Sequence, residues 1–148
     1  MEENNKPVAV DTFGGRIHVE WDPQAAVTPL GQLPFFIEFL KVAELFDPWV
    51  EQSPLAYSSP NAPDKRDILG TMVLSVLAGH KRYAHITSIR CDGVNAELLD
   101  MKKIASEDSV RRAFSGVEKE ACATWQKQHL RRCWEQLLSE PWILDLDA

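Results

Sequence analysis

Trp142-Ile-Leu-Asp-Leu-Asp-Ala148 is the stretch of sequence that decides the expected fold. In an extended strand successive side chains point to opposite faces, so Asp145 and Asp147 share one face and the two leucines share the other. Two carboxylates on an apolar strand lose hydration energy unless a cation meets them, either a basic side chain or a divalent metal. We therefore expect a buried strand that is the first of a catalytic sheet, with the rest of that sheet missing.

Composition indicates one domain with an ordinary hydrophobic core. The chain has 148 residues, of which 45% are hydrophobic and 26% are charged, as in a typical globular protein. The net charge of -6 argues against a nucleic-acid partner. Residues 80–112, however, contain seven basic and five acidic side chains, so this middle part of the chain is net positive.

The sequence favours a cytoplasmic location. Cys91, Cys122 and Cys133 are odd in number and lack CxxC spacing, which favours a reducing compartment. The N-terminus is polar and acidic and does not resemble a signal peptide. The most apolar run, at 68–78, is shorter than the roughly 20 residues that cross a bilayer. We therefore expect no membrane contact and a buried core helix.

The N-terminal segment, residues 1–27, is expected to contain a β-hairpin. Val8–Phe13 and Arg16–Trp21 flank Gly14-Gly15, and glycine accepts the positive φ that a two-residue turn requires. This pattern places the apolar side chains on one face of a ribbon that lies on a core. The expected register pairs Val8 with Trp21, Val10 with Val19 and Thr12 with Ile17.

The next region, residues 28–140, is expected to be mostly helical. Thr28-Pro29 is typical of an N-cap and first turn of a helix that runs to about Phe46, although Pro34 offers a later start. Prolines and serines over 47–64 indicate a loop.

The rest of this region contains the predicted core helix. Asp64 or Asp67 caps it, and Gly79 ends it. Because it is apolar nearly all round, we expect it to be buried on most sides. Further helices are predicted over Tyr83–Arg90, Asn95–Ile104, Ser106–Phe114 and Val117–Ser139. The expected fold class is therefore mainly α with an N-terminal β-hairpin, followed at 141–148 by the first strand of an incomplete α/β core.

Asp145 and Asp147 are the candidate catalytic and metal-binding residues. Carboxylates at the end of a central strand can bind Mg²⁺, which prefers oxygen ligands. Two such ions flank an in-line phosphoryl displacement in nucleases and related enzymes. The alternative is a solvated strand with ordinary surface aspartates, and the spacing alone leaves both interpretations open.

Residues 95–114 have the outline of a helix-turn-helix. Two short helices are separated at Ala105-Ser106, where Ser106 is a good N-cap. Basic side chains lie on both helices and are the candidate DNA-binding residues. They are Lys102 and Lys103 on the first helix and Arg111 and Arg112 on the second. Ordinary helical packing is the alternative interpretation.

A smaller basic and aromatic cluster follows the core helix. It consists of His80-Lys-Arg-Tyr83 together with His85. The cluster can contact a phosphate backbone, but a solvated helix end explains it equally well because cations favour helix C-termini.

Five blocks, taken in order, resemble the N-terminal part of a bacterial insertion-sequence transposase of the DDE class, whose catalytic core belongs to the RNase H-like superfamily. The blocks cover almost the whole chain, and their order is more specific than any one of them. They are Gly14–Asp22, Thr28–Phe36, Lys65–Gly70 with Leu77–His85, Ser106–Phe114 and Trp142–Asp147.

The resemblance implies a catalytic role for the strand end. Asp147, with Asp145 as the alternative, falls on the first acid of the Asp-Asp-Glu triad, which binds Mg²⁺ for DNA cleavage and strand transfer. The other two triad acids are missing, so the resemblance implies a truncated or partial transposase with a truncated RNase H-like core, inactive on its own.

The resemblance also implies that the helical region binds transposon-end DNA. Arg111 and Arg112 are then expected on the DNA face, with Lys102 and Lys103 as supporting phosphate contacts. The apolar tail favours self-association as well. Two rival functions are a stand-alone helix-turn-helix regulator and a helical protein-interaction domain.

Overall fold

The computed structural model describes residues 7–20, 30–57, 59, 61–91 and 94–135. The predicted strand at 141–148, with Asp145 and Asp147, lies outside these residues. The described part is mainly helical and begins with a two-stranded antiparallel hairpin, which confirms the coarse fold class. Its elements are β1 (Val8–Thr12), β2 (Gly15–Val19), α1 (Leu33–Val42), α2 (Phe46–Glu51), α3 (Lys65–Leu77), the 3₁₀ turn η1 (Tyr83–His85), α4 (Ile86–Arg90), α5 (Val94–Glu97), α6 (Glu107–Ser115) and α7 (Lys119–Trp134).

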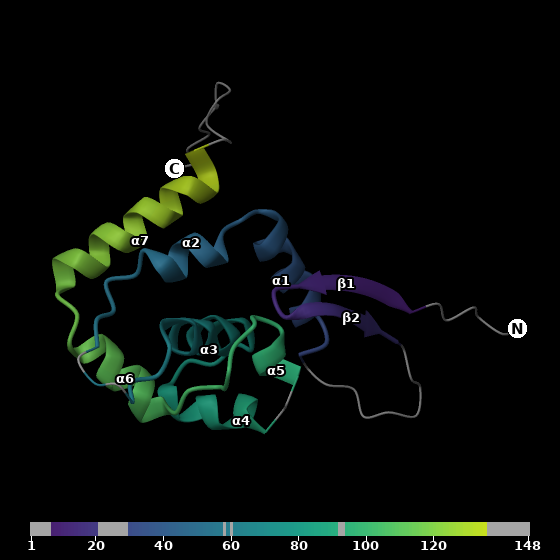
Figure 1. Ribbon diagram of the computed structural model, residues 1–148, viewed down its shortest axis with the longest axis horizontal. Coiled ribbons are helices and arrows are strands. Elements are labelled where there is room, and N and C mark those ends of the chain that lie inside the picture. The colour runs from purple at the N-terminus through teal and green to yellow at the C-terminus, as the bar shows by residue number, and fades with distance from the viewer. Residues whose placement is uncertain (1–6, 21–29, 58, 60, 92–93, 136–148) are drawn as a thin grey trace, which may run out of the picture.

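Helix α3 is at the centre of the described fold. Figure 1 shows it between α2 and α7 on one side and α4, α5 and α6 on the other, and it packs directly against α2, α4, α5 and α6. Asp64 caps it by accepting a hydrogen bond from the N–H of Arg66 at 3.0 Å. Gly79 follows its end with a φ of 78°, which glycine adopts without strain. Ile68 and Leu74 are fully buried, so the predicted core helix is confirmed.

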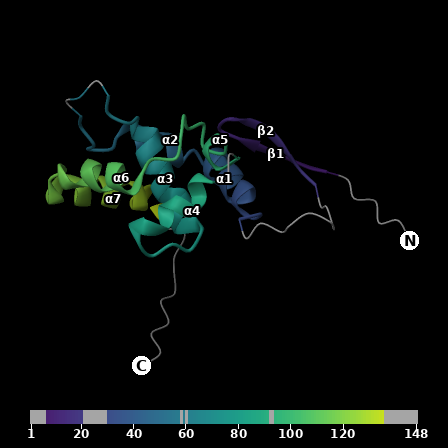
Figure 2. The same cartoon turned by 90° about the horizontal axis from the view of Figure 1, so that it is seen from below.

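The hairpin forms, but the predicted register is wrong by two residues. Val10 faces Ile17 and Thr12 faces Gly15, so the turn is Phe13-Gly14 rather than Gly14-Gly15. A shift of two residues keeps every side chain on its expected face, and Val10 accordingly remains buried. Figure 2 shows the hairpin extending away from the helices along α1.

Contacts made by the turn explain this register. The ring of Phe13 lies 5.4 Å from the ring of Phe46. The guanidinium of Arg66 lies over both rings, 5.7 and 5.3 Å from their centroids, as in a cation–π contact. Gly14 passes the carbonyl oxygen of Glu97 so closely that a Cβ atom there would overlap it. The protein therefore needs phenylalanine followed by glycine in the turn.

The helix predicted to run to about Phe46 ends earlier, because α1 stops at Val42 and a separate helix, α2, begins at Phe46. Helix α1 starts late, with Pro34 in its first turn, and Glu44 in the break has a φ of 51°. Helix α2 then occupies the first part of the predicted loop at 47–64, where that prediction is wrong. Pro48 lies in the first turn of α2, where its missing N–H has no helical partner to lose.

The prediction of a helix at Asn95–Ile104 is also wrong. Only the single turn α5 is helical there, and residues 101–106 are irregular. The following helix, α6, forms as predicted, with the hydroxyl of Ser106 accepting a hydrogen bond from the N–H of Ser109 at 3.2 Å. One of the two predicted helices is thus absent, and the helix-turn-helix outline at 95–114 does not form.

Polar side chains of α3 hold the irregular segment in place. Asp67 accepts a hydrogen bond from the N–H of Lys102 at 2.9 Å. Thr71, one turn further along α3, accepts a hydrogen bond from the N–H of Ala105 at 2.9 Å. These bonds satisfy backbone groups that a helix would otherwise have satisfied. The segment therefore lies along α3, and Ile104 is buried.

Helix α7 lies across α2 and is attached mainly through tryptophans. The ring of Trp125 stacks on Trp49 at a centroid distance of 4.8 Å, and its indole N–H donates to the carbonyl oxygen of Trp49 at 2.9 Å. Of the residues at helical spacing along α7, Trp125 and His129 are buried, whereas Cys133 is exposed.

The close approach of the hairpin to α5 leads to a stability prediction. Replacing Gly14 by alanine places a methyl group against the carbonyl oxygen of Glu97, so the turn has to move. We expect the free energy of unfolding to fall by about 1–3 kcal/mol, measured by urea denaturation with tryptophan fluorescence. Gly116→Ala is the control, because nothing lies within 4 Å of a Cβ atom at that position. Equal stability of the two variants would contradict the prediction.

The buried carboxyl group of Asp67 leads to a pH prediction. Burial is the largest influence on this group and raises its pKa, outweighing the hydrogen bonds from the backbone N–H groups of Lys102 and Lys103. The folded protein thus holds the proton more tightly than the unfolded chain, so this contribution to stability is present at low pH. It is lost as the pH rises from the unfolded pKa through the folded one.

Asp67→Asn removes this titration and keeps a side-chain oxygen for the N–H of Lys102. We expect its free energy of unfolding to fall less steeply than that of the parent protein as the pH rises above about 4. The control is Asp100→Asn, an exposed position with a φ of 52° that asparagine also adopts. An unchanged pH profile for Asp67→Asn would refute the prediction.

Candidate nucleic-acid interface

The four predicted DNA-binding cations lie on two neighbouring segments. Lys102 and Lys103 belong to the segment that Asp67 and Thr71 hold against α3. Arg111 and Arg112 lie on α6, which packs against α3 through its buried residues Val110 and Ala113. All four basic side chains are therefore exposed, as a contact to phosphate requires.

Two of these four cations form ion pairs with carboxylates. The guanidinium of Arg111 forms ion pairs with Asp108 at 3.1 Å and with Glu107 at 3.5 Å. The ammonium of Lys102 lies 3.6 Å from a carboxylate oxygen of Asp64. These pairs are exposed and individually weak, but the adjacent negative charge repels a phosphate. Arg111 and Lys102 are accordingly the less suitable pair for binding DNA.

The other two cations meet at one cavity. Lys103 and Arg112 both line a cavity of about 430 Å³ between the loop at 56–63 and α6. Arg112 donates through Nε to the carbonyl oxygen of Asp108 at 3.2 Å. Neither Lys103 nor Arg112 forms an ion pair with any residue that the structure describes. The cavity thus combines two positive charges with no opposing carboxylate in ion-pair contact.

Tyr57 contributes a third group to the same cavity. Its hydroxyl is buried and has no hydrogen-bond partner in the described part of the chain. Burial, and then the charge of Asp64, raise the pKa of this hydroxyl, so it remains a proton donor at neutral pH. A buried hydroxyl without a partner costs roughly 1–3 kcal/mol. Tyr57 lines the same cavity as Lys103 and Arg112, and a hydrogen-bond acceptor for its hydroxyl would remove that cost.

No sequence pattern identified Tyr57 as a candidate site residue. It is an isolated aromatic residue in a proline- and serine-rich loop, and such a residue is usually explained by loop packing. Ser109 on α6 also lines the cavity, where its hydroxyl shares a 2.8 Å hydrogen bond with that of Ser106. We call the site formed by Tyr57, Lys103, Ser109 and Arg112 the α6 cavity.

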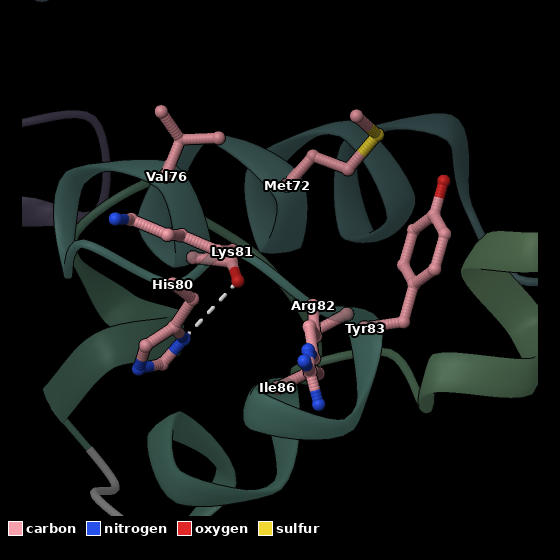
Figure 3. A pocket seen from close by; sticks show the side chains of 8 residues that line it. Met72, Val76, His80, Lys81, Arg82, Tyr83 and Ile86 are labelled. Carbon is pink, nitrogen blue, oxygen red and sulfur yellow. Dashed lines mark hydrogen bonds between the residues drawn. The ribbon is translucent and has the colours of Figure 1, made fainter.

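The predicted histidine-containing cluster forms a second basic surface. Lys81, Arg82 and Tyr83 line a smaller cavity between the end of α3 and η1, shown in Figure 3. Within the described residues Lys81 and Arg82 take part in no ion pair. Because η1 packs against α6, this surface and the α6 cavity border the same helix.

An apolar groove lies on another part of the structure, where α7 faces α1 and α2. Phe36, Trp49 and Leu130 are among the residues that line it. His129 also lines the groove, and burial, together with the charge of Arg132, lowers its pKa. The groove contains no combination of basic side chains like that of the α6 cavity.

The predicted metal-binding residues Asp145 and Asp147 lie outside the described residues, so the structure gives them no geometry. Among the residues that are described, no group of three or more His, Cys, Asp or Glu side chains is placed to hold a metal ion. In the same part of the chain, no helix combines the length and apolar character needed to cross a membrane.

Comparisons with protein-family models, with curated proteins and with solved structures found no match to this chain. The resemblance to DDE transposases therefore rests on the sequence blocks, and its functional consequences are proposals.

The hydroxyl of Tyr57 leads to a prediction that separates stability from binding. Tyr57→Phe removes a buried group that lacks a partner, so we expect stability without ligand to be unchanged or to rise by up to about 1 kcal/mol. The same change should weaken binding of phosphate-containing ligands several-fold. Urea denaturation with and without inorganic phosphate measures both effects. A loss of stability without phosphate would show that the hydroxyl already has a partner in the folded protein.

Proposed function

We propose that this chain is the N-terminal, DNA-binding region of an insertion-sequence transposase of the DDE class, acting in DNA-mediated transposition. In this proposal residues 7–135 contact the transposon ends. Asp145 and Asp147 then belong to the first strand of an RNase H-like core, where they would bind Mg²⁺. The ordered sequence blocks and the exposed basic residues beside α6 support the proposal.

One observation carries the DNA-binding part. Lys103 and Arg112, nine positions apart in sequence, line one cavity together with Tyr57, whose hydroxyl is buried and has no partner among the described residues. A phosphate group carries negative charge, which attracts the two cations, and its oxygen atoms accept hydrogen bonds from hydroxyl groups. The gathering of these two cations at one cavity, although the chain has a net charge of -6, supports an anion site there.

The proposed contacts position DNA rather than read its sequence. Side chains that bind phosphate fix the register of a protein on the duplex, whereas base edges specify the sequence. Because the two-helix outline at 95–114 is absent, recognition of transposon ends does not follow the helix-turn-helix mode. We expect the affinity of this region to be modest and to fall as the salt concentration rises.

A pair of double variants tests the proposal. Lys103→Ala with Arg112→Ala removes the two cations of the α6 cavity, whereas Lys102→Ala with Arg111→Ala removes their ion-paired neighbours. Both double variants change the net charge equally. We expect the first to weaken binding of a duplex of about 20 base pairs far more than the second. It should also reduce the slope of log affinity against log salt by about 2. Fluorescence anisotropy at low salt measures both quantities.

Two outcomes would count against the proposal. Equal weakening by the two double variants would show a general charge effect, without a role for the α6 cavity. No DNA binding at all, together with sedimentation that depends on protein concentration, would favour a helical protein-interaction domain. The apolar groove lined by Phe36 and Leu130 supports that second candidate, because both side chains are exposed.

A further inference from the structure

The cavity between α3 and η1 is open to solvent and is lined by both apolar and basic side chains. Its volume is about 290 Å³, near the lower end of the range of about 300–1,000 Å³ for ligand pockets. Met72 and Val76 of α3 line one side, and Ile86 lines the other. A group that fills this space must be small and largely apolar.

Three consecutive residues complete the cavity. Arg82 has an extended backbone with φ -140° and ψ 146°, and the η1 turn begins directly after it. This change of backbone direction separates neighbouring side chains. In Figure 3, Lys81 extends toward Val76, Tyr83 stands at the opposite end near Met72, and Arg82 points away from α3. The ring of Tyr83 is 43% exposed, so it offers aromatic surface to a ligand.

Hydrogen bonds hold this arrangement in place. Nδ1 of His80 lies 3.1 Å from the hydroxyl of Ser75, and Nε2 lies 3.1 Å from the hydroxyl of Ser88. The hydroxyl of Ser88 also donates to the carbonyl oxygen of His85 at 2.8 Å. The segment that carries Lys81, Arg82 and Tyr83 is thus fixed at both ends. A fixed site loses less conformational entropy when a ligand binds.

A nucleobase next to phosphates matches this combination. A base is a flat, largely apolar ring that stacks on an aromatic side chain, and the phosphates on either side of it carry negative charge. A purely apolar ligand would form no ion pair with Lys81 or Arg82. A small anion would form no contact with the ring of Tyr83 and the apolar lining residues. A ligand contacts both the aromatic ring of Tyr83 and the two cations only when it has a flat ring and a negatively charged group.

We propose that this cavity binds one unstacked nucleobase of DNA, with Tyr83 stacking on the base and Lys81 and Arg82 contacting the flanking phosphates. The inference rests on the proposed function and deepens it, because it makes strand ends or open duplex the preferred substrate. Since η1 packs against α6, this cavity belongs to an element that contacts the helix carrying Arg112.

The test compares forked and blunt DNA of equal length. The forked duplex carries 2-aminopurine in its unpaired arm, and the blunt duplex has every base paired. We expect the protein to bind the fork more tightly and to quench the 2-aminopurine fluorescence by stacking. Tyr83→Ala should weaken binding of the fork roughly 5- to 150-fold and leave binding of the blunt duplex unchanged. Tyr83→Phe keeps the aromatic ring and should behave as the parent protein does.

The controls separate this inference from the proposed function. Unchanged binding of blunt DNA by Tyr83→Ala shows that this variant is folded. If Tyr83→Ala binds the fork as the parent protein does, or if 2-aminopurine is not quenched, the inference is overturned. The proposed function still stands in that case, provided that the Lys103 and Arg112 double variant loses affinity. If the parent protein binds neither DNA, both proposals fail.

Discussion

The hydrogen bonds from one face of α3 to the segment that follows α5 are the constraint on which the rest of the structure depends. Asp67 and Thr71 accept hydrogen bonds from the N–H groups of Lys102 and Ala105, and Arg66 donates to the carbonyl oxygen of Leu99 at 2.8 Å. Together they replace the hydrogen bonds of a helix that the local sequence favours. Because the segment is extended along α3, its lysines lie beside α6, where the arginines are.

Arg66 extends the same constraint to the N-terminal hairpin. Its guanidinium forms an ion pair with Asp47 and lies over the rings of Phe13 and Phe46. One side chain of α3 therefore joins the hairpin turn, α2 and the segment around Leu99. A planar guanidinium suits this role, because it donates in its plane and stacks through its faces. The start of α3 thus fixes the hairpin, α2 and the irregular segment relative to one another.

The electrostatics of the basic region depend on local pairing and not on net charge. Lys102 and Lys103 are neighbours in sequence, as are Arg111 and Arg112, yet within the described part of the chain only one cation of each pair has a carboxylate partner. On α6 the reason is helical spacing: Glu107 and Asp108 lie three or four positions before Arg111. The ion pair between Lys102 and Asp64, by contrast, depends on tertiary structure alone. An acidic chain can in this way present a restricted basic site.

The sequence by itself determined the hairpin, the core helix α3 with Asp64 as one of two possible caps, and the cap of α6 at Ser106, because turns, caps and periodicity are local. It also identified the four basic candidates. Tertiary structure decided the hairpin register, through Phe13 and Gly14, and replaced the helix expected after Asn95 by a segment bonded to α3. It likewise decided which cations are paired and brought Tyr57 to the α6 cavity. These features depend on partners distant in sequence, which local patterns do not specify.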